Sequence, residues 1–202
     1  MAAFTGIRSV GQSIVAFLNA RWDVEPMPGG PPGSLLRDDL TASIELVSSG
    51  ELAGENVSYN NTITLWLYRV SVNEQMRNRS RNGQRSSVPL HVDLHYLLTS
   101  WADTADVEHR LMGWAMRTLQ DASILDASFL SPDGMWHPDE VVHLTSEELS
   151  NEDMLRLWDS LQPNYRLSYS YVARVVSMEA TEVPDVDTPV IARRIEVSDE
   201  EI

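Results

Sequence analysis

The segment Thr62–Val72 constrains the fold of this chain more than any other segment, because it alternates as a β-strand and is apolar on both faces. One face holds Ile63, Leu65 and Leu67. The other face holds four further apolar residues, namely Trp66, Tyr68, Val70 and Val72. Successive side chains of a strand point to opposite faces of the sheet. A strand that is apolar on both faces is therefore a central strand covered on each side, or one that meets another subunit.

The rest of the chain places helices and further strands around this segment. Apolar residues at helical spacing predict helices at 5–19, 103–120 and 145–161. Alternating residues predict strands at 40–46, 88–98, 141–144 and 165–178. Thr145 and Glu148 have the spacing of a capping box, which marks the start of the last helix. Proline and glycine predict a loop at 25–33, and residues 123–138 are expected to be irregular.

This order of elements predicts one α+β domain over residues 1–178, with a mostly antiparallel or mixed sheet and helices packed against it. A chain of 202 residues is long enough for such a core, and 43% of its residues are hydrophobic. It contains no cysteine, which excludes disulfides and thiolate chemistry. No apolar run reaches the ~20 residues of a membrane span, and there is no secretory signal. We expect a soluble protein that is made in the cytoplasm.

The charge of the chain argues against two classes of partner. Its formal net charge is −15, and a field of that sign repels nucleic-acid phosphates and anionic lipids. The sequence therefore predicts neither a nucleic-acid partner nor a membrane partner. All 15 basic residues are arginine; arginine suits ion pairs at interfaces, although a coding bias produces the same composition.

A basic segment interrupts this acidic background between residues 73 and 87. It contains four arginines and only one acidic residue, and the arginines are Arg77, Arg79, Arg81 and Arg85. Three interpretations stay open, namely a solvated hairpin loop, a protein interface and a site for nucleic acid. The last is the weakest, because single strands bind on aromatic side chains, and this segment has none.

The carboxyl-terminal residues 179–202 form an acidic tail with eight acidic residues and two arginines. This composition is typical of a disordered extension. The tail nevertheless contains a short β-prone stretch, whose apolar residues are Val190, Ile191, Ile195 and Val197. Such a stretch can add a strand to the sheet edge of a neighbouring subunit. A loose tail and strand addition are the two alternatives.

Motifs for catalysis are absent from the sequence, with one group of residues left to consider. No G-x-S-x-G elbow is present, and the phosphate-binding loop needs a lysine that the chain lacks. His91, Asp93 and His95 alternate on one strand face and have the chemistry of a divalent-metal site. Same-face neighbours lie ~6.5–7 Å apart, so the two histidines are far apart to share an ion. A metal-dependent enzyme is therefore only an alternative hypothesis, and we expect neither a cofactor nor a catalytic residue.

Several short motifs follow one another in an order and spacing typical of one family. They are Leu65-Trp66-Leu67-Tyr68-Arg69-Val70 with Asn73 and Arg77-Asn78, Pro89-Leu90 with Asp93-Leu94-His95-Tyr96-Leu97-Leu98-Thr99, Leu111-Met112-Gly113-Trp114-Ala115-Met116, Leu157-Trp158, and Tyr165-Arg166-Leu167-Ser168 with Tyr171. Over roughly residues 5 to 178 the chain thereby resembles the conserved domain of the cap, or tail terminator, proteins of phage-tail-like contractile injection systems. The resemblance is to the antifeeding-prophage and virulence-cassette type.

The resemblance implies a tail-terminator-like fold and a structural function without catalysis. Such a protein forms a ring, expected to hold six copies, that closes the baseplate-distal end of the inner tube and anchors the last sheath layer. Its implied partners are other copies of the chain and the tube and sheath subunits. The resemblance further implies a particle that is assembled in the cytoplasm and can be released. An adaptor that belongs to the same particle but does not cap it is a further alternative.

Overall fold

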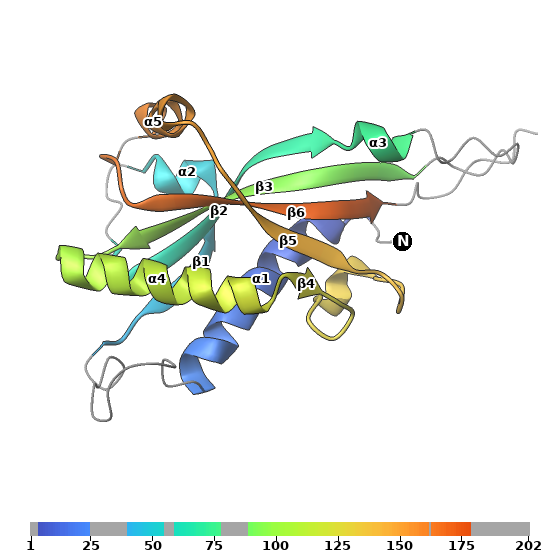
Figure 1. Cartoon of the computed structure of the whole chain (residues 1–202), viewed down its shortest axis with the longest axis horizontal. Helices are drawn as coiled ribbons and strands as arrows, with labels where there is room; N and C mark the ends of the chain where they lie inside the picture. The colour runs from blue at the N-terminus through green and yellow to red at the C-terminus, as the bar shows by residue number, and fades with distance from the viewer. Residues whose placement is uncertain (1–3, 25–39, 55–58, 78–88, 162, 179–202) are drawn as a thin grey trace, which may run out of the picture.

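The structure, a computed structural model, describes residues 4–24, 40–54, 59–77, 89–161 and 163–178. A single six-stranded sheet forms its centre, with helices on both faces (Figure 1). The strands are β1 (Ser43–Val47), β2 (Thr62–Val72), β3 (Leu90–Trp101), β4 (Ile124–Leu125), β5 (Val142–Glu147) and β6 (Ser168–Met178). The helices are α1 (Gly6–Val24), α2 (Ser49–Leu52), α3 (Glu74–Arg77), α4 (Ala105–Asp121) and α5 (Asn151–Asp159), with a 3-10 turn at Pro132–Gly134.

The strand order in the sheet is β1-β2-β3-β6-β5-β4. Only β1 and β2 run parallel, and every other neighbouring pair is antiparallel. β2 and β3 lie inside the sheet, as the two apolar faces of Thr62–Val72 predicted. The architecture confirms the predicted α+β domain with a mixed, mostly antiparallel sheet. The division into a domain at 1–178 and a tail at 179–202 stays a prediction.

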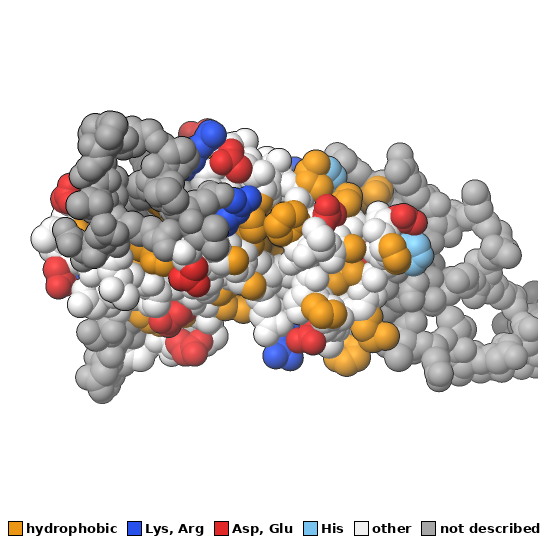
Figure 2. Space-filling model, turned by 90° about the horizontal axis from the view of Figure 1, so that it is seen from below, with side chains coloured by type: hydrophobic (Ala, Val, Ile, Leu, Met, Phe, Trp, Pro, Cys, Tyr) orange, Lys and Arg blue, Asp and Glu red, His pale blue; other side chains and the backbone are white. Residues whose placement is uncertain are grey.

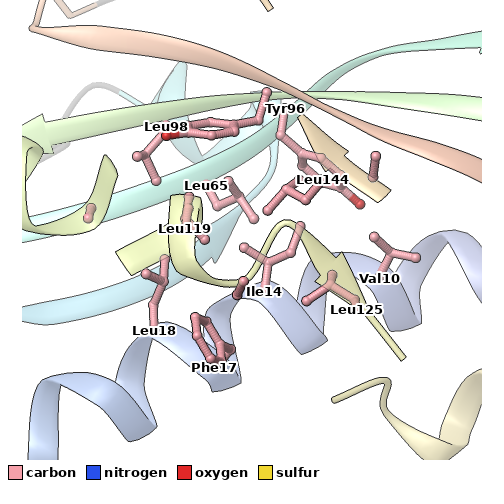
Figure 3. Packing of buried hydrophobic residues seen from close by; sticks show 14 of the residues in the cluster. Val10, Ile14, Phe17, Leu18, Leu65, Tyr96, Leu98, Leu119, Leu125 and Leu144 are labelled. Atoms are coloured by element: carbon pink, nitrogen blue, oxygen red, sulfur yellow. The ribbon is translucent and has the colours of Figure 1, made fainter. Parts of the chain in front are cut away.

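The main core lies between the first face of the sheet and the helices α1 and α4. Figure 3 shows the side chains of α1 pointing toward those of the strands. The fully buried side chains of this core include Val10, Ile14, Leu18, Leu65, Leu94, Leu98, Leu111 and Leu119. The helix α4 begins where predicted, because the Thr104 side chain accepts a hydrogen bond from the Val107 backbone N–H as an N-cap.

A smaller aromatic core covers part of the second face, under α2 and α5. Its buried members are Val47, Leu52, Trp66, Leu97, Trp101 and Trp158. The predicted cap of the last helix was wrong. Thr145 lies inside β5, and α5 starts six residues later with Ser150 as its N-cap, accepting from the Asp153 N–H. The Ser48–Glu51 capping box of α2 was missed, although its S-x-x-E spacing is visible in the sequence.

A β-bulge in β2 corrects the predicted orientation of its last residues. The pairing of β2 with β3 shifts between Leu67 and Arg69, so Tyr68 has no directly opposite partner. Val70 then lies opposite Leu94 and Val72 opposite Val92. Because those two partners belong to the main core, Val70 and Val72 share its face of the sheet rather than the face of Trp66. A bulge inserts one residue, which reverses the alternation that follows it.

Candidate functional site

The second face of the sheet is polar in the half that α2 and α5 leave uncovered. Figure 1 shows both helices over one half of the sheet, while β2 and β3 continue beyond them toward α3. In this part the bulge turns Arg69 and Ser71 to the same face as His95 and Asp93, their partners in β3. The sequence pattern had marked only the β3 residues, because the bulge cannot be recognised from alternation alone.

His95 and Glu147 are the centre of this polar surface. The His95 Nδ1 atom lies 2.7 Å from Glu147 Oε2, and the side chain of His95 is 5% exposed. Ser71 Oγ lies 2.8 Å from the other ring nitrogen, Nε2. Arg69 donates to Glu147 Oε1 at 3.3 Å, and the Tyr68 hydroxyl donates to Glu147 Oε2 at 3.2 Å. The carboxylate of Glu147 therefore joins residues of β2, β3 and β5.

These contacts set the pKa of Glu147. Burial is the largest single influence on this pKa, and by itself it would raise the pKa above its ordinary value of 4.5. The hydrogen bond and the charge of His95, the Tyr68 hydroxyl and the charge of Arg69 act in the opposite direction and prevail, so that the pKa is lowered. Glu147 is thus held as a carboxylate by its neighbours, as expected of a group that fastens strands together.

The structure does not bring His91, Asp93 and His95 together as one metal site. His91 Nδ1 lies 2.7 Å from Ser177 Oγ. Asp93 accepts from the Asn73 amide at 3.1 Å and faces Arg174 at 3.5 Å. Within the described ranges, no three histidine, cysteine, aspartate or glutamate side chains are grouped so that they could hold a metal ion. Each of the three residues instead has its own protein partner, which is the arrangement of a hydrogen-bonded sheet surface.

Most of the residues predicted to contact partners lie outside the described part of the chain. Arg79, Arg81 and Arg85 belong to residues 78–88, and the β-prone stretch of the tail belongs to residues 179–202. Arg77 is the last residue of α3. The structure thus places the beginning of the basic segment at the end of the sheet where β2 stops, and the assignment of these residues to an interface stays a prediction.

A feature that the sequence did not indicate is the open edge of β2. The strand β1 pairs with β2 only from Thr62 to Trp66. Beyond that point, residues 67–72 of β2 have β3 on one side and no strand on the other among the residues that the structure describes. On this edge Val70 is 46% exposed and Val72 is 54% exposed. An unpaired strand edge with apolar side chains is a typical site for pairing with another chain.

An apolar groove of about 590 Å³ continues this edge past the end of β1. Its walls come from the first turns of α1, the end of β1, the start of α2 and the middle of β2. The lining residues include Phe4, Ile7, Arg8, Leu46, Leu67 and Tyr96. Burial raises the pKa of the Tyr96 hydroxyl, and this hydroxyl has no hydrogen-bond partner in the described part of the chain. A buried hydroxyl without a partner is rare in proteins.

Other apolar side chains are exposed away from this edge. Figure 2 shows that they gather over one half of the surface below the sheet. Exposed large residues outside the edge and the groove include Ile124, Phe129, Met135 and Val141. In the described ranges, no helix is both long and apolar enough to cross a membrane.

Comparisons with known proteins identify a family and a similar fold. The Pvc16 N-terminal domain family matches residues 9–192. One similar solved structure is the sheath/tube terminator, in its extended state, of an extracellular contractile injection system, PVC. Its TM-score is 0.56 and its sequence identity is 18%, and the match covers 96% of this chain and 63% of the terminator chain. The tube-terminating cap of the anti-feeding prophage has a TM-score of 0.46 and 19% identity, over 67% of this chain and 49% of its own. No curated protein matches the chain.

The match to the terminator shows a shared fold, and this chain spans 63% of the terminator's length. The family match extends over nearly the whole chain and includes every motif on which the resemblance was based. It confirms the resemblance. The chain belongs to the Pvc16 N-terminal domain family.

Proposed function

We propose that this protein is the cap, or tail terminator, of a contractile injection system. It would close the baseplate-distal end of the inner tube and anchor the last layer of the sheath. Family membership over residues 9–192 is the observation that carries this proposal. The fold shared with a sheath/tube terminator supports it. In this function the protein acts as a structural subunit and not as an enzyme.

The surfaces of the subunit suit a protein that works by contact with other proteins. The open edge of β2, its exposed valines and the adjoining groove offer one apolar surface. In a closed ring each subunit presents two different surfaces to its two neighbours. The basic segment with Arg77, Arg79, Arg81 and Arg85 and the acidic tail carry opposite charges that such neighbours can pair.

We further propose a ring of six copies, assembled in the cytoplasm on the growing particle. Tube and sheath subunits are the remaining partners, and the finished particle can be released. The net charge of −15 makes copies of the chain repel one another. A ring must therefore be held by local contacts, such as apolar burial and pairs of opposite charge.

Deleting the gene in the producing cell tests this function. Particles purified from the deletion strain should contain tubes and sheaths of variable length, or should fall apart, when their lengths are measured by negative-stain microscopy. Complementation with the wild-type gene should restore one uniform length. Uniform, stable particles in the absence of the protein would contradict the proposal.

The position of the protein in intact particles separates a cap from an adaptor. Gold labels on tags at the carboxyl terminus should gather at one place on each particle, the end opposite to the baseplate. An adaptor that does not cap the tube would be labelled elsewhere, for instance at the baseplate or along the shaft. Labelling of particles that have lost their sheath would show whether the protein holds on to the tube itself.

A further inference from the structure

We infer that the open edge of β2 accepts residues 190–197 of a neighbouring copy as an added strand. The inference rests on the proposed function in one respect, namely that several copies meet in a ring. It assigns a donor and an acceptor to the contact between copies. The acceptor is residues 67–72 of β2 together with the adjoining groove.

The acceptor edge has the properties that strand addition requires. β1 ends at Val47, opposite Trp66 of β2, so the position beside residues 67–72 is vacant among the residues that the structure describes. An edge of this length presents unpaired backbone N–H and C=O groups, which an added strand satisfies. Arg69 is 50% exposed on one face of this edge, and Val70 and Val72 are exposed on the other. An incoming strand therefore needs one apolar face and one face that tolerates or pairs with a cation.

Residues 190–197 offer one face of mainly apolar character. With a period of two, Ile191, Ile195 and Val197 fall on one face of an extended strand together with Arg193, and Glu196 falls on the other face together with Arg194. When the face with the three apolar residues lies on the side of Val70 and Val72, Glu196 lies on the side of Arg69 and can pair with it. Cross-strand pairs of apolar groups and of opposite charges each stabilise a sheet by about 0.2–1 kcal/mol.

The groove extends the apolar side of the acceptor. It is lined by Leu67 of β2, Leu46 of β1 and the first turns of α1. Gly11 of α1 also lines it, and a side chain at this position would come within 3.0 Å of Leu46. Tyr96 contributes a buried hydroxyl that has no partner in the described ranges.

The topology favours a neighbouring copy over the same chain as the donor. The tail follows Met178, which pairs with Leu90, and it therefore leaves the sheet at the end where β2 also stops. To reach the outer side of β2, the tail of the same subunit would have to cross the connection between β2 and β3 at that end. Connections at one edge of a sheet do not cross one another as a rule. A tail that extends away from its own subunit meets no such obstacle.

Engineered disulfides test the inference, because the chain has no cysteine of its own. Val70→Cys is combined in turn with Ile191→Cys, Ile195→Cys and Val197→Cys, and purified rings are oxidised mildly. We expect at least one pair to give a ladder of covalent oligomers on a non-reducing gel. The ladder should disappear with reductant and in each single-cysteine variant. Val70 is half exposed, so its replacement leaves the core intact.

Matched controls use the opposite strand face. Val70→Cys with Val190→Cys or Ala192→Cys should not form the ladder, since those side chains would point away from Val70. A cross-link within one chain would overturn the inference in favour of a tail that folds onto its own sheet. Rings that cap tubes but give no cross-link in any pair would overturn the inference and leave the proposed function standing. Absence of rings under all conditions would contradict both.

Discussion

At the scale of single residues, Glu147 has the most specific set of contacts on the sheet surface. It joins His95 of β3 with Arg69 and Tyr68 of β2, and its pKa lies below the ordinary value of 4.5. A carboxyl group whose pKa is lowered by folding stabilises the folded state above its unfolded pKa. This contribution disappears as the pH falls through the folded pKa.

We therefore predict that Glu147→Gln lowers the free energy of unfolding by about 1–2 kcal/mol at pH 7, the size expected for hydrogen bonds to a charged group. The difference from wild type should begin to shrink as the pH falls below 4.5, where Glu147 of the unfolded chain takes up a proton, and should vanish once the pH has passed the lower pKa of Glu147 in the folded protein. Urea unfolding at pH 7 and pH 3.5 measures both values. Glu148→Gln is the matched control, since Glu148 is exposed, and it should change stability little at either pH. A difference that grows at low pH would contradict the prediction.

The residue scale also shows where sequence reasoning stopped. His91, Asp93 and His95 share one face of β3, as their spacing predicted. Their partners Ser177, Asn73 and Glu147 lie on other segments and cannot be inferred from spacing. A set of residues that suits a metal in sequence becomes three separate hydrogen-bonded contacts once the neighbouring strands are placed.

At the scale of elements, α5 depends on its tertiary contacts more than on its own length. A helix of nine residues is marginal in isolation. It is held to the sheet through Trp158, which is 3% exposed and packs edge-to-face against Trp101 at 5.9 Å between ring centroids. Leu155, three residues before Trp158 on the same helix, is 52% exposed.

Trp158→Ala should therefore destabilise the protein by about 3–5 kcal/mol, the usual cost of removing a buried large aromatic side chain. Leu155→Ala, the matched control on the same helix, should change the free energy of unfolding by no more than about 0.5 kcal/mol, as surface substitutions do. Thermal and urea unfolding measure both. Equal effects of the two substitutions would show that α5 does not pack as described.

The boundaries of an element could be predicted from the sequence where the local pattern alone determines them. β2 spans Thr62–Val72 as predicted, because strong alternation and polar flanks both fix its ends. The orientation of Val70 and Val72 did not follow, because one bulged residue reverses the alternation without changing the composition. The parallel pairing of β1 with β2 depends on contacts between distant segments, and so does the open edge that it leaves.

At the scale of the whole molecule, charge is the property that most affects how copies of the chain assemble. The subunit carries −15 overall, yet the segment 73–87 is locally basic. Repulsion between copies acts over a Debye length of ~8–10 Å at physiological salt, whereas paired charges at a contact act at shorter range. Assembly should therefore be sensitive to the sign of the basic segment, while folding of the single subunit should not.

Replacing Arg77, Arg79, Arg81 and Arg85 together by glutamate tests this separation. Charge pairs on protein surfaces typically contribute only ~0–1 kcal/mol each to stability, so we expect a cooperative melt close to that of wild type. Assembly, measured by light scattering or by the fraction of rings in negative stain, should be strongly impaired at low salt. It should recover in part at high salt, because screening weakens the added repulsion.

The same four arginines replaced by glutamine serve as the control. If loss of attraction matters, this neutral variant also assembles poorly; if only repulsion matters, it assembles like wild type. Assembly of the glutamate variant at the wild-type level in low salt would mean that this segment takes no part in contacts between subunits.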